Sequence, residues 1–280
     1  KLRYKVVIVA PTCFYYQVPL FRTLADDPRI DLTVYFCSAE SLNGEDVLKT
    51  FNTDGRWGVE DDLLTGYKHI FLRNFSPRGS YLKWPFGLMN FGILRHIYRA
   101  RPDAVVLMSW TNITWWLAIL ACLAFKVPFL YMTDANVLSE HPKARLHRRV
   151  KNLMLANFVF KATRGFLCAG TANKLLYQRY GVPDEKLVSF AYSWGYQSLL
   201  RNSETLMRRK KQILAELGIP ENKWVILYCG RFSEEKSPGD LLEAYRLVKQ
   251  PNKALVFVGD GELRRSLEAQ VAEHNIESVY

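Results

Sequence analysis

Short uninterrupted runs of apolar residues alternate with longer amphipathic stretches along the chain. The first run, residues 6–10, has no polar position, which is typical of a parallel strand covered on both faces. Further strands are predicted at residues 31–38, 68–74, 104–110, 128–133, 165–170 and 186–192. Helices are predicted between them, at residues 18–26, 86–100, 114–125, 144–161 and 173–180. Repeated β-α units of this kind predict an α/β fold with a doubly wound parallel sheet.

The β-α pattern stops near residues 192–200 and then begins again. After a charged helix at residues 204–217, the second series has strands at 224–229 and 254–258 and helices at 238–248 and 262–274. We therefore predict two Rossmann-like domains, residues 1–195 and 196–280, that face each other across a cleft. The last residues, 276–280, resemble a strand that is just beginning. Because two strands alone leave both sheet edges open, we expect the chain to be truncated in its second domain.

One apolar segment, residues 104–125, carries no charge and is long enough to span a bilayer. Polar residues from Ser109 to Thr114 interrupt it, and Lys126 and Pro128 follow it. A buried strand, a turn and a buried helix explain the segment without a membrane. We therefore predict this arrangement rather than a transmembrane helix.

The charge of the chain is unusual, with 38 Lys and Arg residues against 27 Asp and Glu residues and a net charge of +11. This excess predicts an anionic partner, which could be a nucleotide phosphate, an acidic membrane surface or nucleic acid. Basic residues cluster at 143–151 and at 208–211, where the alternative is a solvated helix face. No nucleic-acid-binding signature accompanies the charge, so nucleic acid is not the expected partner.

The five cysteines lie in apolar contexts, and no pair has the spacing of metal ligands. Their odd number in a chain of this size argues against a disulfide framework. We therefore expect a reducing, cytoplasmic compartment and cysteines that act as small buried apolar residues.

Two turns in the second half of the chain have a composition suited to an anionic ligand. The first follows the strand at 224–229 and contains Gly230, Arg231 and Lys236, just before a helix that begins with Pro238. Arginine can bind a phosphate through two parallel hydrogen bonds, lysine adds a point charge, and a helix N-terminus favours an anion. The second turn holds Gly259 and Gly261 after the strand at 254–258, without the third glycine of a dinucleotide-binding motif.

These two stretches, GRFSEEKSPGDLLEAY and VFVGDGELRRSLE, resemble the donor-domain signature of family-4 retaining glycosyltransferases, also called glycosyl transferases group 1. The resemblance implies a GT-B fold, in which residues 1–195 would form the acceptor domain and 196–280 part of the donor domain. It extends over most of the chain, since AGTAN at 169–173 and YGVP at 180–183 are similar to the end of that acceptor domain.

The resemblance also implies a function and a site. Arg231 and Lys236 would bind the diphosphate of a nucleotide sugar, and Gly230, Gly259 and Gly261 would let the backbone approach it. The acceptor would be a hydroxyl of a saccharide, a lipid-linked molecule or a small molecule, and no cofactor or divalent metal would be needed. The pair of glutamates that such enzymes use for the donor sugar would lie beyond residue 280, so residues 1–280 would be inactive alone.

Several residues leave alternatives open. Asp134, after the strand at 128–133, could orient an acceptor hydroxyl or cap a helix. His141 and His147 are predicted as surface or capping residues. The basic helix near residue 143 suits an anionic membrane surface, which would make the enzyme peripheral on the inner face of a membrane. A non-catalytic module that binds a nucleotide or a polyanion is the alternative to an enzyme.

Overall fold

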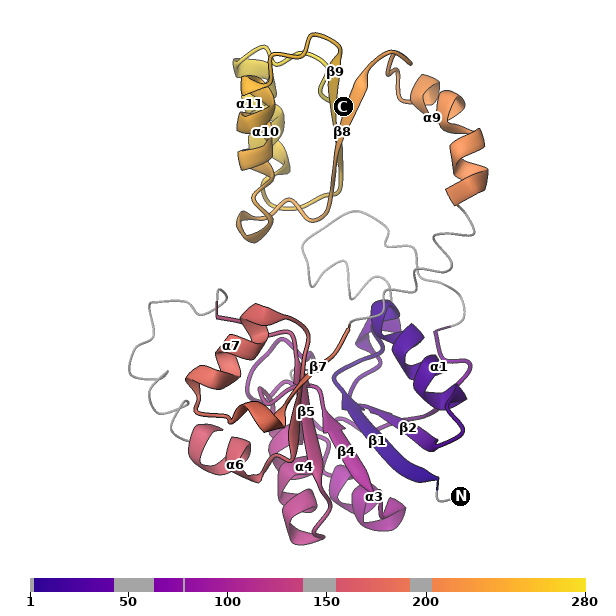
Figure 1. Cartoon of the computed structure of the whole chain (residues 1–280), viewed down its shortest axis with the longest axis vertical. Helices are drawn as coiled ribbons and strands as arrows, with labels where there is room; N and C mark the ends of the chain where they lie inside the picture. The colour runs from indigo at the N-terminus through magenta and orange to yellow at the C-terminus, as the bar shows by residue number, and fades with distance from the viewer. Residues whose placement is uncertain (1–2, 43–62, 78, 138–154, 192–202) are drawn as a thin grey trace. The chain divides into compact units, whose positions relative to one another are not determined.

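The computed structural model describes residues 3–42, 63–77, 79–137, 155–191 and 203–280 (Figure 1). The described residues divide into two compact units, the first ending at residue 191 and the second beginning at residue 203. The hinge predicted at residues 192–200 lies outside them, as do His141, His147 and the basic cluster at 143–151.

A sheet of parallel strands forms the first unit, in the order β3-β2-β1-β4-β5-β6-β7. Its strands are β1 (Tyr4–Ala10), β2 (Ile30–Phe36), β3 (Lys68–Phe71), β4 (Ala104–Leu107), β5 (Phe129–Thr133), β6 (Gly165–Cys168) and β7 (Leu187–Ser189). The order reverses between β1 and β4, and ligands of open α/β sheets bind outside the carboxyl ends of the strands at such a point. The prediction of a doubly wound sheet is confirmed.

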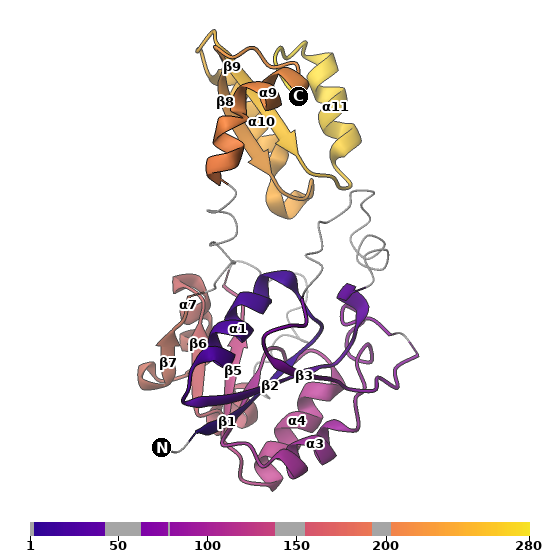
Figure 2. The same ribbon diagram turned by 90° about the vertical axis from the view of Figure 1, so that its right-hand side faces the viewer.

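Helices cover both faces of this sheet (Figure 2). One face carries α1 (Val18–Asp26), which buries Val18 and Phe21 against β1 and β2. The other face carries α3 (Ile93–Ala100), α4 (Ile113–Ala124), the π-helical turn η3 (Leu155–Val159), α6 (Phe160–Ala162) and α7 (Thr171–Arg179). The described residues of this unit also form 3-10 turns, η1 (Tyr15–Gln17), η2 (Glu40–Leu42) and η4 (Asp184–Lys186).

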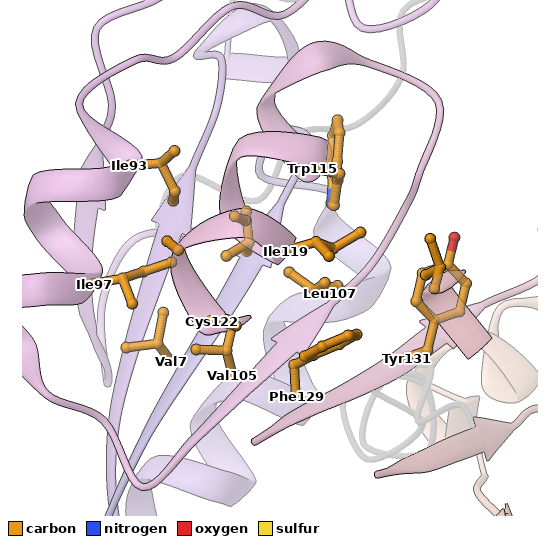
Figure 3. Packing of buried hydrophobic residues seen from close by; sticks show 14 of the residues in the cluster. Val7, Ile93, Ile97, Val105, Leu107, Trp115, Ile119, Cys122, Phe129 and Tyr131 are labelled. Atoms are coloured by element: carbon orange, nitrogen blue, oxygen red, sulfur yellow. The ribbon is translucent and has the colours of Figure 1, made fainter. Parts of the chain in front are cut away.

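The larger core of the first unit lies between the sheet and the helices α3 and α4 (Figure 3). Ile93 and Ile97 of α3 pack beside Trp115 and Cys122 of α4, all of them almost fully buried. The strands present Val7, Val105, Leu107, Phe129 and Tyr131 to the same cluster. Only one face of each helix contributes to the core, so the opposite faces of α3 and α4 point outward.

The apolar segment at 104–125 folds as predicted, into strand β4, a polar turn and helix α4. Asn112 in the turn is buried, and its side-chain oxygen accepts a hydrogen bond of 3.2 Å from the N–H of Leu88. Among the described residues, no helix has the length and apolar character needed to cross a membrane.

The helix predicted at 86–100 is shorter than expected, because α3 begins only at Ile93. The preceding residues are held in a non-helical path by side chains from other segments. Asn74 accepts a hydrogen bond of 2.9 Å from the N–H of Met89, and a side chain on Gly87 would collide with the carbonyl oxygen of Ser80. These are tertiary contacts that helical periodicity does not report.

The second unit contains two parallel strands, β8 (Trp224–Cys229) and β9 (Lys253–Val258), which form a sheet separate from that of the first unit. Its other elements are α9 (Lys210–Glu216), η5 (Glu234–Lys236), α10 (Pro238–Leu247) and α11 (Arg264–Glu273). One core joins α10 and α11 to the sheet, and a smaller cluster joins α9 to β9. Val279 forms a parallel bridge with Leu255, so the residues at 276–280 do begin a strand, as predicted.

Candidate functional site

The loop between β8 and α10 holds both predicted phosphate-binding side chains. Arg231 follows the carboxyl end of β8 and is half-buried, while Lys236 ends the short turn η5 and is exposed. Buried Phe232, between them in sequence, packs its ring 5.9 Å from Tyr228 and 5.8 Å from Phe257. This aromatic contact fixes the loop to the sheet and leaves the cations at its surface.

The side chain of Tyr228, in β8, ties the two ends of this loop together. Its hydroxyl lies 2.9 Å from the carbonyl oxygen of Arg231 and 3.3 Å from that of Lys236, and donates to both. Desolvation raises the pKa of Tyr228 above its ordinary value, which already leaves the hydroxyl protonated at neutral pH. Tyr228 is therefore a positioning residue of the candidate site. Sequence reasoning missed it because its position reads as part of an apolar strand.

Replacing Tyr228 with phenylalanine should remove this restraint without changing the packed ring. We expect a loss of about 1 kcal/mol in the free energy of unfolding and a several-fold rise in the KM for the donor. Tyr245→Phe is the matched control, because the Tyr245 hydroxyl also bonds backbone carbonyls, those of Glu277 and Ser278, but far along the chain from the loop. Denaturant titration and steady-state kinetics on the full-length variants would test this, and equal kinetic effects in both variants would contradict it.

The glycines of the two turns have a structural role, while the predicted approach to a ligand stays a prediction. A Cβ on Gly259 would collide with the carbonyl oxygen of Gly230, and one on Gly261 would lie 2.5 Å from that of Phe232. Both glycines are therefore required for the close packing of the two turns against each other. A Cβ on Gly230 would meet only the Tyr228 side chain, with the hydroxyl at 3.6 Å, which is an ordinary contact.

Backbone hydrogen bonds also join the two turns. The N–H of Gly230 donates to Val258 over 3.0 Å, and the N–H of Phe232 donates to Asp260 over 2.8 Å. The Asp260 carboxylate in turn accepts a hydrogen bond of 2.8 Å from the N–H of Gly261 and faces Arg264 at 3.9 Å. The structure thus brings together the two turns that the sequence predicts to act as one site.

Ser233 is a further polar group of this loop that sequence reasoning missed. Its side chain is 2% exposed, and its hydroxyl oxygen has no hydrogen-bond partner among the described residues. Burying a hydroxyl without a hydrogen-bond partner costs free energy. The Ser233 hydroxyl, close to Arg231 in sequence, is therefore available to donate a hydrogen bond to a ligand. A serine that precedes two glutamates gives no sign of burial in the sequence.

The helix α10 begins directly after this loop. Ser237 precedes it with a φ of 46°, and no side chain accepts a hydrogen bond at this N-terminus. The first-turn N–H groups and the helix dipole favour an anion there. The same stretch also contains the exposed acidic residues Glu234, Glu235 and Asp240. They lower the net positive charge of the stretch, but being exposed they do not bury Arg231 or Lys236.

In the first unit, Asp134 is exposed just after the carboxyl end of β5. Its loop is anchored by Asn173, whose side-chain N–H donates a hydrogen bond of 2.5 Å to Ala135 and whose oxygen accepts one of 3.1 Å from Ala169. The residues up to Val137 are not helical, and 138–154 lie outside the described residues. Both readings of Asp134, acceptor contact and helix cap, therefore stay predictions.

Gln17 is a candidate residue that the sequence does not reveal. It ends the turn η1, which follows β1, and it is 4% exposed. Its side-chain oxygen has no hydrogen-bond partner among the described residues. In the sequence, Gln17 is an ordinary polar residue before a helix. Only its burial in the structure makes it a candidate for contact with a substrate.

The cysteines are all free, and four of the five are buried as predicted. Burial raises the pKa of the Cys122 thiol to about 12 and also raises that of Cys37. Cys229 departs from the prediction, because it is exposed at the end of β8. Within the part of the chain that the structure describes, no three His, Cys, Asp or Glu residues are grouped as metal ligands.

Residues 209–279, nearly all of the second unit, match the family described as glycosyl transferases group 1. The similarity to this family is therefore confined to residues 209–279. The loop with Arg231 and Lys236 and the turn with Gly259 and Gly261 both lie inside the matched region. No curated protein sequence matches the chain.

Several solved structures share the fold of this chain. HepE of Anabaena, in complex with UDP and glucose, has a TM-score of 0.62 at 14% identity, over 99% of this chain and 68% of that one. The UDP-GlcNAc 2-epimerase of Neisseria meningitidis has a TM-score of 0.56 at 16% identity, over 99% and 71%. Sucrose-phosphate synthase of Thermosynechococcus elongatus has a TM-score of 0.56 at 13% identity, over 99% and 70%. The fold is therefore GT-B-like, as predicted.

Proposed function

We propose that the protein transfers a sugar from a nucleotide-diphosphate sugar to an acceptor hydroxyl and retains the anomeric configuration. The observation that carries this is the loop before α10, in which Tyr228 fixes the backbone of both Arg231 and Lys236. UDP-sugars are the first donors to test, because HepE and the 2-epimerase were crystallised with UDP or UDP-GlcNAc. The acceptor would be a saccharide, a lipid-linked molecule or a small molecule.

The reaction breaks the bond between the anomeric carbon and a phosphate oxygen, and that oxygen keeps the electron pair. Negative charge therefore grows on the leaving diphosphate as the new bond to the acceptor oxygen forms. Arg231 and Lys236 would stabilise this charge, and Ser233 could donate a further hydrogen bond to it. The two cations would supply charge that a divalent metal supplies in other transferases, so metal-independent transfer is part of the proposal.

The acceptor is assigned to the first unit. Asp134, exposed at the carboxyl end of β5, would accept a hydrogen bond from the acceptor hydroxyl and so orient it. Gln17 lies in the turn that follows β1, and ligands of such sheets bind outside the carboxyl ends of the strands, so its side-chain oxygen could accept one from a second hydroxyl. Sugars present several hydroxyls, and paired carboxylate and amide acceptors suit them.

Two other functions compete with this proposal. The fold alone does not separate transfer from epimerisation, since a 2-epimerase is among the similar structures. The family match over residues 209–279 favours transfer, and it also favours an enzyme over a non-catalytic nucleotide-binding module.

The full-length protein would be incubated with a panel of UDP-sugars, with and without saccharide acceptors, and with a chelator added in parallel. We expect UDP release that depends on one sugar and persists with the chelator. NMR of the product should show the anomeric configuration of the donor. An inverted linkage would refute retention, and an epimerised UDP-sugar would point to the competing activity instead.

A further inference from the structure

The outer faces of α3 and α4 carry large apolar side chains that no described residue covers. We call these the helix strip: Leu94 and Tyr98 of α3, Leu120 and Leu123 of α4, and Phe125, which follows α4. Tyr98 is 54% exposed and Leu120 is 58% exposed. The two helices pack side by side in Figures 1 and 2, and the rings of Tyr98 and Phe125 are 5.1 Å apart. The strip is therefore continuous across both helices.

Exposed aromatic residues also lie in the segment that precedes α3. We call them the aromatic loop: Phe75, Trp84, Phe86 and Phe91. The rings of Phe75 and Phe91 are 5.8 Å apart, and Phe91 lies two residues before α3. The Ser76 hydroxyl donates a hydrogen bond to the carbonyl of Phe86, which keeps Phe86 close to Phe75. Trp84 is 58% exposed.

Basic residues are interleaved with these apolar ones. Arg95 and Arg99 are exposed on α3, next in sequence to Leu94 and Tyr98, and Lys126 follows Phe125. In the aromatic loop, Lys83 precedes Trp84, and the Arg73 guanidinium lies 4.8 Å from the Phe75 ring centre.

Acidic residues are nearly absent from this part of the chain. Between residues 63 and 133 the sequence has a single acidic residue, Asp103. Its carboxylate accepts a hydrogen bond of 2.7 Å from the N–H of Lys5. Among the ion pairs formed by the described residues, none involves Arg95, Arg99 or Lys126. Glu40 contacts the segment beside the aromatic loop, where its carboxylate accepts hydrogen bonds from Ser80 and Tyr81, so the uncompensated positive charge is that of the helix strip.

We propose that the helix strip and the aromatic loop form a docking surface for an anionic lipid membrane. Leucine and aromatic side chains enter the boundary between headgroups and acyl chains, and arginine and lysine beside them meet the headgroup phosphates. None of its residues belongs to the basic cluster at 143–151 or to the candidate substrate sites.

Charge complementarity favours a lipid surface over a second copy of the chain. A symmetric dimer through the helix strip would bring two positively charged surfaces together, and between residues 91 and 126 only Asp103 is acidic. An anionic membrane offers negative charge over its whole area, and each basic residue near it contributes about 1 kcal/mol to binding. An anionic membrane therefore offers a binding partner to both the apolar and the basic residues of this surface.

Cosedimentation of the full-length protein tests this without any sugar donor. The vesicles would be phosphatidylcholine alone, or equal parts of phosphatidylcholine and phosphatidylglycerol. We expect binding to the anionic vesicles that weakens as salt is added. Arg95→Gln with Arg99→Gln should lower the partition coefficient roughly 20–30-fold. Leu94→Ser with Tyr98→Ser should lower it at least about tenfold.

Two matched controls separate this surface from general charge and general hydrophobicity. Arg179→Gln with Lys249→Gln removes the same charge from positions elsewhere, and Leu175→Ser removes an exposed leucine from α7. These variants should bind the anionic vesicles nearly as the parent protein does. The proposal is overturned if the parent protein does not bind anionic vesicles, or if strip and control variants lose binding equally. It is also overturned if light scattering shows a dimer that Leu94→Ser with Tyr98→Ser dissolves.

Discussion

Replacing Arg231 with alanine is expected to lower the turnover number by roughly 10²–10³. The loss corresponds to about 2–4 kcal/mol of transition-state stabilisation, the usual effect of removing one preorganised donor from developing negative charge. Affinity for the intact donor should fall less, because the diphosphate carries more charge while the bond is breaking. Lys236→Ala should act in the same direction. Steady-state kinetics of donor hydrolysis or transfer on full-length variants would measure this.

Two comparisons sharpen the result. Arg231→Lys keeps the charge but loses the forked geometry, so it should recover only part of the activity. Arg246→Ala is the control, because Arg246 is exposed on α10 in the same unit and pairs with Glu243 at 3.0 Å. Near-normal turnover in both Arg231→Ala and Lys236→Ala would refute the assignment of the diphosphate to this loop, and with it the mechanism proposed above.

Replacing Gly259 with alanine is expected to destabilise the second unit by about 2–4 kcal/mol. The new Cβ would collide with the carbonyl oxygen of Gly230, which belongs to the backbone of a well-packed turn and cannot move alone. The cost would appear in the free energy of unfolding, measured by denaturant titration with circular dichroism.

Two other glycines in the same unit serve as controls for this prediction. Gly239 lies in the first turn of α10, and a Cβ added there would have nothing within 4 Å, so Gly239→Ala should leave stability unchanged or raise it slightly. Gly230→Ala should leave folding unaffected. Any loss of donor binding in that variant would then be due to contact between the added methyl group and the bound donor. Equal unfolding free energies for the Gly259 and Gly239 variants would show that the two turns are not closely packed.

Much of the first unit follows from its apolar runs. Strand β1 and helix α1 lie where periodicity predicts them, because continuous burial on both faces of a parallel sheet leaves a run without polar positions. The helix predicted at 86–100 begins late because side chains distant in sequence, such as Asn74, determine the path before Ile93. A local pattern contains no information about such partners.

The candidate site divides in the same way. The sequence by itself determined that glycine-containing turns follow two consecutive strands and that one of them contains Arg231 and Lys236. Residue type and spacing along the chain are enough to predict these features. Only the tertiary structure decided that Gly259 is needed for packing against Gly230, that Tyr228 fixes the loop, and that Ser233 and Gln17 are buried with unused hydrogen-bonding capacity. The same holds for the exposed strip on α3 and α4, since the sequence shows that a helix is apolar but not which of its faces the core leaves uncovered.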